Sequence, residues 1–433
     1  MELLRTELHP SPVRPDHIRL TGQIRYADGF TEELWFEYPN ELRGKLSATG
    51  NPWLAALLPL AAYRQESLRL GLPVDAQLLA QVPAIMQTWA QWFPNCRPIA
   101  VAADAQPALT RSARVATCFS GGVDSFFSLL SHEPGGPAAA DGPPVDDLVY
   151  VWGFDLKLSH EAQWRRLRDR LASAAAAFRK TLLTPITNIR DTRYRQLDWG
   201  RFGHGPAIAA VFLALESRVG LAYVPATFSE SYGFSWGSHP DLSPRFSTAA
   251  VQFRYDGSSH TRVQKLECVA KHPEALAALH VCWQSRSDQN CGTCEKCIRT
   301  MVILELLGKL RQTTSFPANS LNLATLHRLY VPSHLHDRAI QEVQDHARAA
   351  GRLDLVRSIQ RARQRSAWIR RLGMLGQPYP PKGRIARAVA RRVTKLLLKV
   401  TQSRGTFAAT LAHLICVFTD LDDMLFAALG LGA

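Results

Sequence analysis

The chain has 433 residues, 46% of them hydrophobic, and carries a formal net charge of +14. At roughly 150 residues per domain, this length predicts two or three units that each bury a core. The most apolar stretch, Phe407 to Thr419, is shorter than the ~18 residues that a transmembrane helix needs, and the charged N-terminus does not resemble a signal peptide. These features argue against a membrane or secreted protein and favour the cytoplasm.

Residues 1–110 are predicted to form a separate N-terminal α/β unit. Strands are expected over 17–24, 32–38 and 98–102, and helices over 52–63 and 76–93. No catalytic constellation is visible in this segment. Its tryptophans are more typical of a core or an interface than of a cofactor site.

The most informative motif spans residues 118–125, which read Cys-Phe-Ser-Gly-Gly-Val-Asp-Ser. The residues before it suit a buried strand and those after it a helix, so Gly121 and Gly122 fall at a helix N-terminus. Unpaired backbone N–H groups and the helix dipole favour a polyanion there, and glycine lets the backbone approach it closely. The hydroxyls of Ser120 and Ser125 add donors, and Asp124 is a ligand for Mg²⁺. The motif therefore predicts a site for the phosphates of ATP.

A simple glycine turn between a strand and a helix is the alternative interpretation of this motif. It is not a Walker A loop, because no Gly-Lys-Ser/Thr follows. Instead Ser120 to Ser125, with Val123 between the glycines and Asp124, resembles the signature of the PP-loop ATP pyrophosphatases. The resemblance implies cleavage of ATP to AMP and pyrophosphate through an adenylylated substrate.

Residues 111–312 are predicted to form the nucleotide-binding domain. Further strands are expected to end at 153–155, 187–190 and 223–225, with helices over 161–178 and 204–216 and an extended loop over 133–147. This alternation predicts an α/β fold with a parallel, doubly wound sheet. Its ligand is expected at the carboxyl ends of the strands.

Four of the eight cysteines lie within sixteen residues, with the spacing Cys-x8-Cys-x2-Cys-x2-Cys: Cys282, Cys291, Cys294 and Cys297. Four thiolates at this spacing suit a closed tetrahedral zinc site, which is structural because it leaves no open position. An iron–sulfur cluster uses the same ligands, and spacing alone does not separate the two. Disulfides are disfavoured, since nothing in the chain indicates an oxidising compartment. A helix is expected to leave this knot over 297–307.

Together the two motifs resemble the 7-cyano-7-deazaguanine synthases, a PP-loop family known as QueC, in which the four cysteines bind zinc. The similarity covers roughly 115–308. It implies that Asp155 contacts adenosine and that Lys265 takes the place of a family lysine. In the mechanism we expect, Lys265 and Arg190 are catalytic cations beside Asp124, with Arg299 as a further candidate. Histidines 204, 239 and 260 are candidates for acid–base roles.

The substrate-side loop departs from the family pattern. Residues 241–246 read Asp-Leu-Ser-Pro-Arg-Phe where the family has Asp-Cys-Arg-Pro-Glu-Phe. We predict that His239, Asp241 and Arg245 face the acceptor, and that exchanging an acid for a base changes which substrate fits.

The predicted function is a QueC-like ATP-dependent ligase that joins a small carboxylate to ammonia or an amine, giving an amide or a nitrile. One alternative is an adenylating enzyme with a protein or RNA acceptor, as in QueC-like proteins of antiviral defence operons. A nucleotide-dependent scaffold without turnover is another. The expected cofactors are ATP, Mg²⁺ and Zn²⁺.

Residues 313–433 are predicted to form a basic, mostly helical region. Residues 352–404 contain fifteen Lys and Arg and one acid, Asp354, which accounts for the whole net charge. Apolar residues recur at helical spacing over 385–400 and predict a basic amphipathic helix. Such a helix binds RNA, an acidic protein or an anionic surface, or packs on its own domain. The oligomeric state, including a homo-oligomer, stays open.

Overall fold

The protein forms two compact units in a computed structural model, Met1–Leu321 and a second unit that begins at Asn322. The first unit contains both the predicted N-terminal unit and the predicted nucleotide-binding domain. The predicted amphipathic helix over 385–400 and the apolar stretch from Phe407 lie outside the described residues. The structure describes residues 1–229, 235–285, 287–318 and 320–375.

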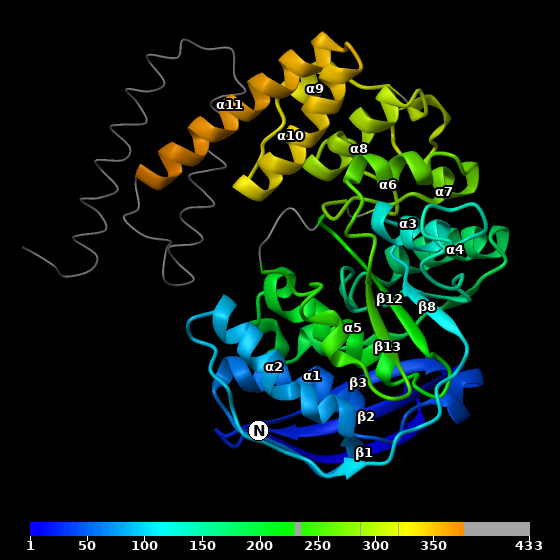
Figure 1. Cartoon of the computed structure of the whole chain (residues 1–433), viewed down its shortest axis with the longest axis vertical. Helices are drawn as coiled ribbons and strands as arrows, with labels where there is room; N and C mark the ends of the chain where they lie inside the picture. The colour runs from blue at the N-terminus through cyan, green and yellow to red at the C-terminus, as the bar shows by residue number, and fades with distance from the viewer. Residues whose placement is uncertain (230–234, 286, 319, 376–433) are drawn as a thin grey trace, which may run out of the picture. The chain divides into compact units, whose positions relative to one another are not determined.

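An antiparallel meander dominates the N-terminal sheet, whose strand order is β11-β3-β2-β1-β4-β6 (Figure 1). Two short strands extend the meander in parallel at one edge, and β11 pairs with β3 at the other. The strands are β1 (Glu2–Pro10), β2 (His17–Arg25), β3 (Thr31–Pro39), β4 (Leu68–Leu70), β6 (Val101–Ala102) and β11 (Ile186–Thr187). A separate parallel pair joins β5 (Val74–Asp75) to β7 (Ala105–Gln106).

Two helices, α1 (Asn51–Arg64) and α2 (Ala76–Trp92), accompany this sheet. The strand β3 buries Leu34, Phe36 and Tyr38 at alternate positions, as expected for a sheet with one face on a core. Helix α1 is buried over most of its length, and the indole of Trp53 lies against Gly22. A Cβ at Gly22 would be 2.4 Å from that ring, so the contact requires glycine.

The second sheet is fully parallel, with the order β10-β9-β8-β12-β13. The predicted α/β architecture with a parallel sheet is thereby confirmed. The strand order reverses between β8 and β12, which is the position where doubly wound sheets bind their ligands. The strands are β8 (Val115–Cys118), β9 (Asp147–Val149), β10 (Thr181–Leu183), β12 (Leu221–Pro225) and β13 (Gln252–Asp256).

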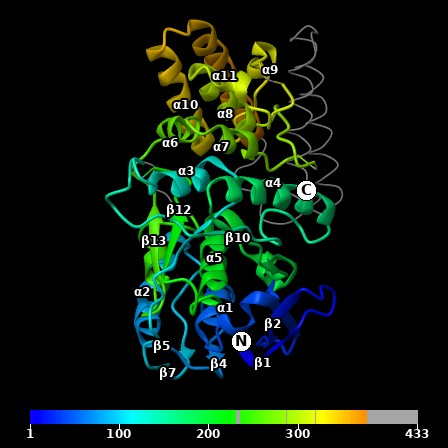
Figure 2. The ribbon, with the colours of Figure 1, turned by 90° about the vertical axis from the view of Figure 1, so that its right-hand side faces the viewer.

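Six helices of the described chain belong to this part of the first unit. Right-handed crossovers place α5 on the face of the sheet opposite α3 and α4, because the chain reverses direction after β10. Helix α5 packs on α1 (Figure 2). The Tyr38 hydroxyl donates to the Val211 carbonyl at 3.0 Å. The helices are α3 (Val123–Ser131), α4 (Glu161–Ala177), α5 (His204–Leu213), α6 (Arg262–Val269), α7 (Pro273–Ala278) and α8 (Glu295–Leu306).

The ends of the second and third predicted strands are wrong. Strand β9 stops at Val149, and residues 153–155 form a turn in which Gly153 has φ +104° and a Cβ would lie 1.9 Å from the Thr187 carbonyl oxygen. After β10 the chain crosses to the other sheet as β11 instead of continuing to residue 190. The Asn188 side chain supports this crossing, because its Oδ1 accepts from Trp35 N at 2.9 Å. Residues Ile189–Asp191 then form the 3-10 turn η2.

The second unit contains three described helices, α9 (Leu323–His327), α10 (His334–Ala349) and α11 (Leu353–Leu375). Helices α10 and α11 pack side by side (Figure 1). Arg363 on α11 donates to both carboxylate oxygens of Asp337 on α10, at 3.0 and 2.9 Å. Part of the basic segment therefore packs on its own unit. No helix in the described part of the chain combines the length and hydropathy needed to cross a bilayer.

Candidate functional site

The residues Ser120 to Ser125, here called the phosphate loop, connect β8 to α3 at the point where the strand order reverses. Gly121 has φ +76°, and a Cβ there would approach the Leu171 side chain to 2.8 Å. Gly122 is the N-cap residue of α3, and among the described residues no side chain caps this helix. The N–H groups of its first turn are therefore free of side-chain acceptors, as an anion site requires.

Asp124 lies between two cations of α6. Its Oδ2 accepts from Arg262 Nη1 at 3.0 Å, and its Oδ1 accepts from Lys265 Nζ at 3.3 Å. The Lys265 side chain is 3% exposed, and its ammonium also donates to the Ala226 carbonyl, just after β12, at 2.5 Å. A capping box fixes the start of α6 and so the direction of both cations.

Burial and charge oppose each other in this group. Burial alone would raise the pKa of Asp124, but the charges of Arg262 and Lys265 hold it below its ordinary value. Burial lowers the pKa of Lys265, and Asp124 opposes that change. The carboxylate is thus ionised near neutral pH and is balanced by cations that a phosphate group would also attract.

Arg190 lies beside the turn that follows β9. Its Nη1 donates to the Phe154 carbonyl at 2.5 Å, and its guanidinium carbon lies 4.7 Å from the centre of the Trp199 ring. Burial lowers the pKa of Arg190, whereas the exposed Asp155 raises it. The structure therefore brings Asp124 and Lys265 into contact and places Arg190 with Asp155.

Two cations escaped the sequence prediction. Arg262 lies one helical turn before Lys265, and that spacing could have indicated it. Lys296 lies inside the cysteine motif, between Cys294 and Cys297. Its ammonium is 6.0 Å from the centre of the Trp283 ring. Burial lowers the pKa of Lys296, with Asp155 opposing this, and the charge of Lys296 in turn contributes to the low pKa of Asp124.

The substrate-side loop contacts the N-terminal helix α2. The Arg245 Nη1 donates to Gln81 Oε1 at 3.1 Å, and its Nε donates to the Asp241 carbonyl at 2.7 Å. The His239 ring packs edge-on against Trp92 with centroids 4.8 Å apart. Asp241 is exposed. Arg245 is therefore bound by α2 and by its own loop.

His204 is held on both ring nitrogens. Its Nδ1 lies 3.0 Å from the Trp199 carbonyl and its Nε2 lies 2.9 Å from Ser238 Oγ. Burial lowers the pKa of His204 and keeps the ring neutral. This residue links the Trp199–Gly203 π-turn to Ser238. The His260 ring packs at a tilt against Phe127, with centroids 4.8 Å apart, and its Nδ1 lies 3.0 Å from Ser259 Oγ.

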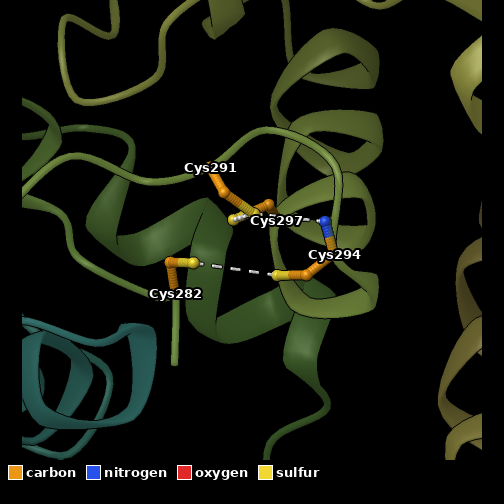
Figure 3. A group of neighbouring side chains, drawn as sticks. All are labelled: Cys282, Cys291, Cys294 and Cys297. Atoms are coloured by element: carbon orange, nitrogen blue, oxygen red, sulfur yellow. Dashed lines mark hydrogen bonds between the residues drawn. The ribbon is translucent and has the colours of Figure 1, made fainter. Parts of the chain in front are cut away.

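The four predicted cysteine ligands form one cluster, here called the Cys cluster (Figure 3). All four sulfur atoms lie within 4.8 Å of one another. The Cys282–Cys294 and Cys291–Cys297 sulfur pairs are 3.9 and 3.8 Å apart. A tetrahedral ion with Zn–S bonds of about 2.3 Å gives sulfur pairs about 3.8 Å apart, so the donors fit a single ion. The cluster can therefore hold a metal ion such as zinc.

Local hydrogen bonds favour thiolates in the Cys cluster. Cys282 Sγ accepts from Ser285 N at 3.2 Å, and Cys291 Sγ accepts from Cys294 N at 3.3 Å. Gly292 supplies the turn between the second and third ligands with φ +70°. All four cysteines are free of disulfides.

Comparison of the chain with models of protein families, with curated proteins and with solved structures finds no match.

Proposed function

We propose that the chain is a PP-loop ligase that uses ATP to adenylate a carboxylate and then joins it to a nitrogen nucleophile. One observation carries the proposal. The phosphate loop starts α3 where the order of a parallel sheet reverses, and Asp124 stands there among Lys265, Arg262 and Lys296. A polyanion and a divalent cation satisfy such a set of free N–H groups, cations and one carboxylate.

In the first step, adenylation of the carboxylate, different residues bind the phosphates and the Mg²⁺ ion. The first turn of α3 and the cations Arg262 and Lys265 bind the phosphates, which releases the Asp124 carboxylate to hold Mg²⁺. An oxygen of the acceptor carboxylate bonds to the α-phosphorus, the bond to the β-phosphate oxygen breaks, and pyrophosphate leaves with the electron pair. The protein contributes positioning and neutralisation of charge.

In the second step an amine or ammonia attacks the acyl carbon of the adenylate. AMP leaves with the electron pair of the broken C–O bond, the nitrogen loses a proton, and an amide forms. Arg190, with Asp155, lies at the adenosine or acceptor end of the site. In the 7-cyano-7-deazaguanine synthases a second adenylation dehydrates the amide to a nitrile.

The metal ion that we propose for the Cys cluster is zinc, in a structural role. Four thiolates leave no coordination position for a substrate. Metal analysis should find one zinc per chain, and the protein should lack the visible absorption of an iron–sulfur cluster. Iron with that absorption would replace this assignment.

A second candidate function is adenylation of a macromolecular acceptor, either a protein or an RNA. The loop around Arg245 favours it, because this base stands where the 7-cyano-7-deazaguanine synthases have an acid, and Gln81 of α2 binds it. The same assay distinguishes the two candidates.

The deciding experiment incubates the zinc-loaded protein with ATP, Mg²⁺, ammonium and 7-carboxy-7-deazaguanine and quantifies AMP and pyrophosphate. The Asp124→Asn variant is the inactive control. Pyrophosphate that depends on the acid supports the small-molecule ligase. ATP binding without stimulation by the acid redirects the search to macromolecular acceptors, and absence of ATP binding by calorimetry would refute the ATP site.

A further inference from the structure

The segment 278–297 joins the phosphate loop to the Cys cluster. The His280 N–H donates to the Gly121 carbonyl at 2.7 Å, and Cys282 follows two residues later. Asn290, 1% exposed, stiffens this stretch because its Oδ1 accepts from the N–H groups of Val281 and Cys282 at 2.8 and 3.1 Å. The backbone of His280–Cys282 is therefore hydrogen-bonded to the phosphate loop at one end and carries the first predicted metal ligand at the other.

The far end of the same segment contributes Lys296. Cys294 is the N-cap residue of α8, so Lys296 occupies the first turn of that helix between two cluster cysteines. The charge of Lys296 lowers the pKa of Asp124, at the start of α3. In turn, Asp155 raises and Arg262 lowers the pKa of Lys296. Cys294 Sγ lies 3.9 Å from Cys282 Sγ, and His280, two residues before Cys282, donates to Gly121, so the first turn of α8 lies close to the phosphate loop.

Among the described residues, Lys296 lacks the acidic partner that Arg262, Lys265 and Arg299 each have. Arg262 and Lys265 pair with Asp124, and Arg299 pairs with Glu295. Among the described residues, no carboxylate oxygen lies within the 4.0 Å of an ion pair from the Lys296 ammonium. It is therefore a half-buried cation that still has charge to satisfy.

We infer that Lys296 binds a phosphate group of the nucleotide, and that a metal ion in the Cys cluster sets its position. The inference rests on the proposed ATP site and goes beyond it, because the metal becomes a partner of the nucleotide. Ligation of Cys294 and Cys297 orders the first turn of α8. A cation that is already in place loses less conformational freedom when the nucleotide binds.

Such coupling is reciprocal. The factor by which the metal tightens nucleotide binding must equal the factor by which the nucleotide tightens metal binding. We expect a factor of about 10, within the usual range of about 5 to 150. This equality makes the inference testable without turnover.

The experiment measures binding of a non-hydrolysable ATP analogue with Mg²⁺ to the full chain, loaded with zinc or stripped by a chelator. Zinc affinity is measured with a competing chromophoric chelator, with and without the analogue. The test variant is Lys296→Gln, and the matched control is Lys309→Gln, whose ammonium contacts only Gln312 among the described residues. Circular dichroism checks that each form is folded.

Wild type and Lys309→Gln should both bind the analogue about tenfold more tightly with zinc. Lys296→Gln should lose most of this gain and the matching gain in zinc affinity. If the stripped protein unfolds, the zinc-loaded forms decide, because Lys296→Gln must then bind the analogue about tenfold more weakly than the control. Equal affinities of the two variants overturn the inference and leave the ATP site intact. A zinc-loaded wild type that binds no analogue overturns the proposed function and the inference together.

Discussion

Asp124 is the residue on which the stability and the proposed chemistry of the site meet. Its carboxylate is 20% exposed and balances the ammonium of Lys265, which is 3% exposed. A buried cation without its partner is costly, since the protein interior does not solvate it as water does. The same carboxylate would hold the divalent cation, so its removal is expected to affect folding and binding at once.

Asp124→Asn should lower the free energy of unfolding by about 3 kcal/mol, because Lys265 stays buried without its counter-charge. The variant should also release no pyrophosphate. Chemical denaturation and the pyrophosphate assay measure the two effects. An unchanged denaturation midpoint would contradict the ion pair.

The pH dependence of that difference has a definite sign. The folded-state pKa of Asp124 is lowered, so its ionisation adds stability above the ordinary carboxyl value near 4 and loses it as the pH falls through the lowered value. Melting temperatures of wild type and Asp124→Asn should therefore differ at pH 7 and converge below about pH 4. A difference that does not shrink as the pH falls below about 4 would show that the lost stability comes from packing.

Gly121 and Gly29 offer a matched pair of substitutions. Both have positive φ, +76° and +80°, but a Cβ at Gly29 meets nothing within 4 Å, whereas one at Gly121 approaches Leu171 to 2.8 Å. Each change to Ala should cost about 1–2 kcal/mol from the backbone. Only Gly121→Ala should also weaken ATP binding, measured by calorimetry. Equal ATP affinities would remove the steric argument for the loop.

At the scale of elements, the sequence predicts those strands and helices whose apolar residues follow a local pattern. Strand β3 was expected over 32–38 because Leu34, Phe36 and Tyr38 alternate with polar residues. Strand β1 was missed, since Leu3 is its one buried residue and its sequence shows no clear alternation. The crossing at β11 depends on Asn188 meeting Trp35, a contact across 153 positions that no local pattern reveals.

The candidate site followed the same division. The two motifs indicated the phosphate loop and the Cys cluster, because their spacing is local. Lys296 was missed, since its role depends on where α8 points after the fold has formed. The predicted acceptor role of Arg245 depends on the resemblance of its loop to the family pattern, and no local pattern indicates its contact with α2.

Helix α2 should hold the substrate-side loop in place. Removing the indole in Trp92→Ala takes away the surface on which His239 packs. We expect amide hydrogen exchange in residues 237–246 to become several-fold faster, because local opening costs less when packing is lost. The control is Gln91→Ala, an exposed neighbour on the same helix. Equal exchange in the two variants would separate α2 from the loop.

At the scale of the whole molecule, the proposed ATP site and the excess positive charge belong to different segments of the chain. The phosphate loop and the Cys cluster belong to the unit that ends at Leu321, whereas the whole net charge of +14 falls within residues 352–404. A chain shortened to 1–321 keeps the core that surrounds both sheets and should still bind ATP with the affinity of the full chain.

Only the full chain should bind RNA, with an affinity that falls steeply as salt rises, because counterion release drives contacts to phosphates. Filter binding over a range of salt concentrations measures this difference. Salt-sensitive RNA binding by the full chain alone would support a macromolecular acceptor. Equal RNA binding by both chains would instead indicate that the basic region packs on its own unit. The Arg363–Asp337 pair already shows such packing for part of α11.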